Sequence, residues 1–174
     1  MGLSDIKKLR EVTSLGINDC KKALSETKGD FNQALKILKN KGIQMLQKKG
    51  SRLASQGLVE SYVHFGGNLG VLVEINCETD FVARTEKFKK FVKDVAMQIA
   101  AANPEYIKKE DIPADVLNSV KNPDEYVKQY CLLNQPFIKD SKNTVEDCLR
   151  EIVSQTGENI VIRRFTRFSL GEEH

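Results

Sequence analysis

The first 42 residues carry apolar side chains at the three- to four-residue spacing of amphipathic helices. Three polar residues are placed to cap three such helices: Ser4, Asn18 and Asp30. Gly29 and Gly42 are expected to end the second and third helices, because glycine adopts the backbone conformation that closes a helix without strain. The pattern therefore predicts a three-helix N-terminal module over residues 1–42, joined to the rest by a basic helical connector over residues 43–56.

From residue 57 the apolar spacing changes to two, which is the period of a strand. Two alternating runs flank Gly66-Gly67-Asn68, so we expect a β-hairpin. A strong helical pattern over 85–102 follows, and its inward positions are Phe88, Phe91, Val92, Val95 and Ile99.

Further along the chain, short helical pieces are expected within 104–122. Helices are predicted at about 123–133 and from Thr144 to Gly157, and a closing strand at 160–168. Strands at both ends of a run of helices predict an α+β core over residues 57–174, in which helices pack on one face of a small antiparallel sheet.

The net charge of +3 is unevenly divided along the chain. Residues 1–56 hold 12 Lys and Arg against 5 Asp and Glu, whereas residues 57–174 hold 15 against 19. Solvated helix faces, a nucleic-acid surface and a surface for an acidic protein all fit a basic front. No apolar run reaches the roughly 18 residues of a membrane span, so we expect no membrane partner and a place in the bacterial cytoplasm, a plastid stroma or another organelle.

Catalytic and metal-binding residues are sparse. The four cysteines form no CxxC pair, and the chain has only two histidines. The sequence therefore predicts reduced, packed thiols, no cofactor, no metal site and no enzymatic reaction. Arg163, Arg164 and Arg167 lie close together near the C-terminus, and we expect them to form salt bridges with the acidic helices and not to bind nucleic acid.

The stretch Glu74-Ile-Asn-Cys-Glu-Thr-Asp-Phe-Val-Ala-Arg84 passes from a predicted strand to a helix. Thr79 is a candidate helix cap, and Asp80 then falls in the first turn, where the helix dipole favours an acid. Phe81 has two interpretations. It is either a core residue or an exposed wedge for another protein.

Residues 74–84 resemble the core signature of the elongation factor Ts family at essentially every position. Residues 9–24 resemble the N-terminal signature of that family, and 133–137 with 157–165 resemble its C-terminal part. The front third also resembles ubiquitin-associated three-helix modules.

The family resemblance implies a nucleotide-exchange factor for the GTPase elongation factor Tu. It implies that four residues disturb the Mg²⁺ site of that GTPase: Asp80, Phe81, Val82 and Ala83. It further implies that the N-terminal module binds the GTPase through Arg10, Val12, Ile17, Lys21 and Lys22. No direct nucleic-acid contact is expected.

Two departures from the family pattern bear on assembly. The chain has room for one core subdomain where relatives often have two, and its segment 112–130 is short. This pattern is similar to that of short family members, and it implies a homodimer and a 2:2 complex with the GTPase.

Two functions of other classes stay open at this point. One is a ubiquitin-associated-like adaptor, which only the first third of the sequence supports. The other is a ribosome- or RNA-binding protein, which the positive charge of residues 1–56 supports. Purification with a GTPase, with ubiquitin or with RNA separates the three.

Overall fold

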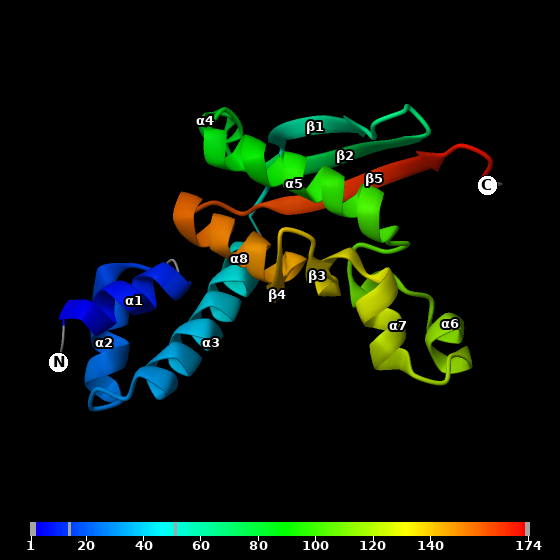
Figure 1. Ribbon diagram of the computed structural model, residues 1–174. Helices are drawn as coiled ribbons and strands as arrows, with labels where there is room; N and C mark the ends of the chain where they lie inside the picture. Colours follow the sequence, from blue (N-terminus) through cyan, green and yellow to red (C-terminus); the bar gives the residue numbers. More distant parts are fainter. Residues whose placement is uncertain (1–2, 14, 51, 173–174) are drawn as a thin grey trace. The chain divides into compact units, whose positions relative to one another are not determined.

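The computed structural model describes residues 3–13, 15–50 and 52–172 (Figure 1). The chain divides into two compact units. The first consists of Met1–Leu53 with Arg150–Asn159, and the second of Ala54–Leu149 with Ile160–His174. The expected division into 1–42, 43–56 and 57–174 stays a prediction.

The first unit contains the three expected helices, α1 (Leu3–Thr13), α2 (Ile17–Glu26) and α3 (Phe31–Lys49). Their inward residues form one buried cluster: Leu9, Leu15, Cys20, Ala23, Leu24, Ala34 and Leu38. The side-chain amide of Asn159 donates to the carbonyl oxygen of Arg52 (2.8 Å), which ties the 150–159 segment to residue 52 within this unit. The predicted three-helix module is confirmed.

The helix ends of this unit were predicted with mixed success. Asp30 caps α3 as expected, because its carboxylate accepts from the backbone N–H of Gln33 (3.0 Å). Asn18 is not a cap, since α2 begins at Ile17 with Gly16 as its N-cap, and Ser4 lies inside α1. Gly42 does not end α3, which runs on to Lys49. One glycine costs a helix interior only about 1 kcal/mol, and the residues after it are largely good helix formers.

The second unit is built on a three-stranded antiparallel sheet of β1 (Gln56–Val63), β2 (Leu69–Cys77) and β5 (Val161–Ser169), in the order β1-β2-β5. Helix α5 (Glu86–Ala102) lies across one face of this sheet and contacts β1 and β2 (Figure 1). All five predicted inward residues of α5 are buried, and so are Val71, Val73 and Ile75 of β2. The α+β fold class and the helix-on-sheet core are therefore confirmed.

The elements between α5 and β5 are mostly short. They are η1 (Lys109–Asp111), α6 (Ala114–Ser119), α7 (Pro123–Tyr130), η2 (Leu132–Asn134), β3 (Pro136–Phe137), β4 (Asp140–Thr144) and α8 (Val145–Thr156). The last of them, α8, begins in the second unit and ends in the 150–159 segment assigned to the first. The short helical pieces, α7 and α8 match expectation, and Thr144 caps α8 by accepting from the N–H of Asp147 (3.1 Å). The hairpin of β3 and β4 was missed, because strands of two and five residues show no usable alternation.

A buried amide pair fixes this hairpin to α5. The Gln98 amide nitrogen donates to the side-chain oxygen of Gln135 (3.2 Å), and its oxygen accepts from the N–H of Ile138 (2.8 Å). Gln135 in turn donates to the carbonyl oxygens of Ala102 and Gln129. A buried polar network stabilises a fold when its donors and acceptors are paired, as they are here.

The three arginines near the C-terminus do not share a face. Arg164 pairs with Glu74 on the neighbouring strand (2.7 Å), and Arg167 pairs with Glu172 (2.8 Å). The hydrogen bond from Arg164 holds the pKa of the Glu74 carboxyl below its usual value. Salt bridges were expected here, but the prediction that the acidic helices would provide the partners was wrong. The register of β2 against β5 places Glu74 opposite Arg164, and Glu172 near the chain end pairs with Arg167.

Gly57 is the glycine on which the β1–β2 pairing depends. Its φ is +145°, and an added Cβ would lie 2.2 Å from the carbonyl oxygen of Ile75. Gly66, in the hairpin turn, has φ of +93° but open space around it.

We expect Gly57→Ala to lower the free energy of unfolding by at least about 2 kcal/mol, because it adds a backbone clash to the backbone strain. Gly66→Ala is the matched control, because it adds the backbone strain of a positive φ without a clash. It should lower the free energy of unfolding by about 1 kcal/mol. Denaturant unfolding of both variants measures the difference. Equal losses would show that the clash at Gly57 is relieved without cost.

Candidate partner-binding site

The sequence 74–84 forms a one-turn helix, α4 (Asp80–Ala83), between β2 and α5. Thr79 caps this helix as expected, because its hydroxyl oxygen accepts from the N–H of Val82 (3.4 Å). Helix α4 contacts both β1 and β2, and it stands at the N-terminal end of α5 (Figure 1). The turn is thus held by elements on both sides of it.

Hydrogen bonds and one buried methyl group fix α4 in place. The buried thiol of Cys77 donates to the carbonyl oxygen of Thr79 (3.1 Å), and the Thr85 hydroxyl donates to that of Val82 (2.8 Å). Thr85 also caps α5 by accepting from the N–H of Phe88 (3.3 Å). Ala83 is only 6% exposed, so its side chain faces inward. Its expected contact with a partner stays a prediction.

Phe81 is 80% exposed. Residues two apart lie about 200° apart around an α-helix, so burial of Ala83 turns Phe81 outward. The interpretation of Phe81 as a core residue is wrong. An exposed aromatic on a capped, anchored turn is a typical interface anchor.

Asp80, beside Phe81, is half-buried and paired. Its carboxylate lies 2.9 Å from the guanidinium of Arg84, one helical turn later, and its side chain is 48% exposed. Sequence reasoning did not assign a role to Arg84, although the acid–base spacing of four residues was a usable signal. The pair holds the Asp80 carboxylate toward Arg84, on the same short helix as Phe81.

The expected contact residues of the N-terminal module are all exposed, but they do not form one face. Ile17 and Lys21 lie one turn apart on α2 and share a side of it. Arg10 and Val12 lie on opposite flanks of α1, about 200° apart.

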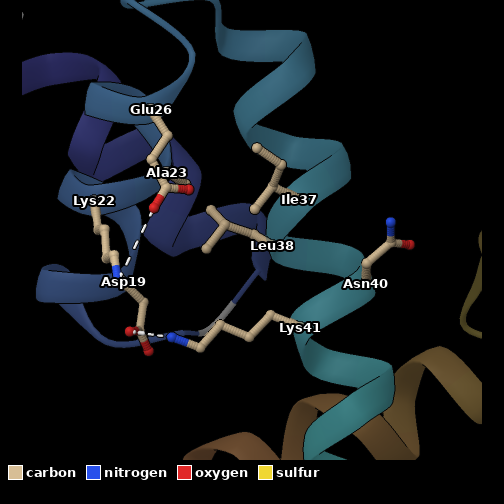
Figure 2. A pocket seen from close by; sticks show the side chains of 8 residues that line it. All are labelled: Asp19, Lys22, Ala23, Glu26, Ile37, Leu38, Asn40 and Lys41. Atoms are coloured by element: carbon tan, nitrogen blue, oxygen red, sulfur yellow. Dashed lines mark hydrogen bonds and ion pairs between the residues drawn. The ribbon is translucent and has the colours of Figure 1, made fainter.

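Lys22 lies apart from Ile17 and Lys21, beside a groove of about 350 Å³ between α2 and α3 (Figure 2). Two ion pairs line the groove: Lys22 with Glu26 (4.0 Å) along α2, and Lys41 with Asp19 (2.5 Å) between α3 and α2 (Figure 2). Its apolar floor comes from Ala23, Ile37 and Leu38 (Figure 2). Of the five expected residues, the structure therefore groups Ile17 with Lys21 and separates Lys22 from them.

The described residues offer little reactive chemistry. Within 3–13, 15–50 and 52–172, no three His, Cys, Asp or Glu side chains gather as metal ligands. All four cysteines are free thiols, and burial raises the pKa of Cys131 to about 11. No helix in the part of the chain that the structure describes is long and apolar enough to cross a membrane. What the arrangement provides is contact surface.

Comparison with known proteins identifies the family. The family model described as "Elongation factor TS" matches residues 4–125. The chain is 48% identical to elongation factor Ts of Caldanaerobacter subterraneus subsp. tengcongensis over 190 aligned positions, which cover 96% of this chain and 95% of the relative. It is 47% identical to elongation factor Ts of Carboxydothermus hydrogenoformans (96% and 88%) and of Geotalea uraniireducens (97% and 89%).

These matches place the chain among the elongation factors of protein biosynthesis. The chain belongs to the elongation factor Ts family. Each alignment has at least 190 positions, whereas this chain has 174 residues. Each relative therefore has at least 16 residues in the aligned region that have no counterpart in this chain.

We expect Phe81→Ala to leave the free energy of unfolding within about 1 kcal/mol of the wild type, because the ring makes few contacts within the chain. Phe88→Ala is the matched control. Its ring is fully buried under the sheet face, so truncation should cost about 3–5 kcal/mol. Thermal and denaturant unfolding of both variants measures this, and a Phe81→Ala loss as large as that of Phe88→Ala would contradict an exposed ring.

Proposed function

We propose that this chain is a guanine-nucleotide exchange factor that binds elongation factor Tu in its GDP form and promotes GDP release. Family membership supports the partner. The observation that carries the proposal is the exposed Phe81 ring on a turn whose other side is buried. A bacterial cytoplasmic setting fits the relatives named above.

In the proposed mechanism, Phe81 inserts between side chains of the GTPase next to the helix that supports its Mg²⁺ site. Asp80 contacts the same region, with its carboxylate already oriented by Arg84. Val82 is half-buried, and in this proposal its exposed part adds to the same contact. Insertion favours a GTPase conformation in which the ion and the phosphates are poorly held.

The exchange follows from negative linkage between two ligands. If the factor weakens GDP binding by some ratio, GDP weakens factor binding by the same ratio. A ligand shifts such an equilibrium only through its differential affinity for the two conformations. The proposed exchange involves no covalent step, so it needs no catalytic residues.

The N-terminal module supplies the second contact in this proposal. Ile17 and Lys21 provide an apolar and a cationic group on one side of α2, and Arg10, Val12 and Lys22 add further exposed groups. Exposed cations raise the rate of encounter with an acidic surface. The ubiquitin-adaptor and RNA-binding alternatives use only this module and leave Phe81 without a role.

Release of labelled GDP from elongation factor Tu tests the proposal. Wild-type chain should accelerate release strongly, and Phe81→Ala should lose about 30-fold in apparent efficiency, the equivalent of about 2 kcal/mol of lost contact. Asp80→Ala should lose less, because its exposed pair with Arg84 is worth little on its own.

Ile138→Ala is the matched control, since it truncates another exposed apolar side chain in the β3–β4 hairpin and should leave exchange unchanged. A correctly folded Phe81→Ala variant with normal exchange would overturn the proposal. So would a wild-type chain that leaves GDP release at its spontaneous rate.

We further propose that the active form is a homodimer in a 2:2 complex with the GTPase. The sheet face opposite α5 supports this proposal, because it carries exposed apolar side chains from all three strands: Val59, Val63, Leu72 and Phe168. A groove of about 290 Å³ runs along it past Val59, Leu72 and Thr166. Contiguous apolar surface of this kind is typical of an interface.

We expect the wild-type chain to be a dimer in light scattering at micromolar concentration, and Leu72→Asp to be a monomer, because a charge would be buried on the proposed interface. Leu53→Asp is the matched control, since Leu53 is 83% exposed outside this sheet. A wild-type monomer with full exchange activity would contradict the dimer.

A further inference from the structure

A second cleft lies in the sheet-bearing unit, at the start of β5. It has a volume of about 360 Å³, within the range of ligand pockets. Its walls are largely aliphatic: Ile107, Leu133, Leu149, Ile160, Val161 and Ile162. Three of these residues, Leu149, Ile160 and Ile162, are buried. The cleft contains none of the residues assigned to exchange.

The polar rim of the cleft consists of Lys108, Asp111 and Arg163. Asp111 is already engaged, because its carboxylate accepts from the backbone N–H of Lys108 (3.1 Å) and lies 3.9 Å from the ammonium of the same residue. Lys108 and Asp111 therefore compensate each other. The positive charge of Arg163 also helps to lower the pKa of the Glu74 carboxyl, but Glu74 already pairs with Arg164. Among the described residues, two arginines therefore face one glutamate, and one positive charge has no paired acid.

Arg163 differs from its neighbours on β5. Arg164 and Arg167 each pair with a glutamate, whereas Arg163 forms no ion pair with any residue that the structure describes. The pairing of β2 with β5 shifts register at this point, since Glu74 faces Arg164 while Ile75 faces Ile162. Arg163 is thus the extra residue of a β-bulge. Bulges redirect side chains, and here the bulge brings Arg163 to the rim of the cleft.

We propose that this cleft binds an aliphatic monocarboxylate, with the alkyl chain among the six apolar residues and the carboxylate on Arg163. A guanidinium donates two parallel hydrogen bonds to a carboxylate, which fixes its orientation. The one positive charge that remains after Glu74 pairs with Arg164 matches a single negative charge and not a phosphate dianion. The described residues that line the cleft include no aromatic ring, which disfavours a nucleotide base because a base needs a stacking surface.

Titration of the full-length chain with octanoate tests the site by calorimetry and by amide chemical shifts. We expect a dissociation constant on the order of 1 mM. The amides of Ile107, Ile162 and Arg163 should shift. Acetate, which has the charge without the chain, and 1-octanol, which has the chain without the charge, should each bind at least tenfold more weakly.

Arg163→Gln should weaken octanoate binding about tenfold or more, because it removes the charge-assisted hydrogen bonds. Arg164→Gln is the matched control. It removes the adjacent guanidinium, which pairs with Glu74, and should leave octanoate binding unchanged. Thermal unfolding verifies that both variants are folded.

The proposal is overturned if octanoate shifts none of these amides at about 10 mM, ten times the expected dissociation constant. It is also overturned if the wild type binds 1-octanol as tightly as it binds octanoate. Equal affinity of the wild type and the Arg163→Gln variant for octanoate would overturn it as well. GDP release is measured separately, so the exchange function can fail or stand independently of this site.

Discussion

The arrangement of the candidate site depends on one geometric constraint: a helix of a single turn can bury only one side. Helix α4 has four residues, and its inward position is taken by Ala83, whose small side chain fits against the strands. Phe81 lies about 200° away and has no inward direction open to it. The caps at Thr79 and Thr85 prevent α4 from merging with α5 or unwinding into β2. An apolar ring is therefore held in water by the packing of its neighbours.

Local signals in the sequence predicted most of the elements, and long-range contacts account for the errors. The β1–β2 hairpin, α5 and the Thr79 cap follow from spacing and capping chemistry within a few residues. Whether Phe81 lies inside or outside depends on which side of α4 meets the sheet, and no local pattern encodes that. The partners of Arg164 and Arg167 depend on strand register and on the chain end in the same way. Gly42 is a different kind of error, because here a local signal was misleading. The glycine was expected to end α3, but the helix formers around it continue the helix to Lys49.

A factor that works by contact requires rigid, exposed groups more than it requires reactive ones. Within the described residues, the buried polar groups Gln98 and Gln135 serve the fold, and the thiol of Cys77 supports the carbonyl of Thr79. Rigid presentation reduces the entropy cost of binding, since the turn that carries the ring is already in place. In the proposed complex, the binding free energy gained at Phe81 and at the N-terminal module stabilises a conformation of the GTPase that holds Mg²⁺ and GDP poorly.

The most direct test of this account is fluorine NMR of the chain with 4-fluorophenylalanine at position 81. In the free chain the fluorine resonance should be narrow and close to that of the unfolded chain, because the ring is in water. On addition of elongation factor Tu with GDP, it should shift and broaden as the ring is enclosed. A buried-type resonance in the free chain, or an unchanged resonance when the complex is otherwise formed, would contradict the account.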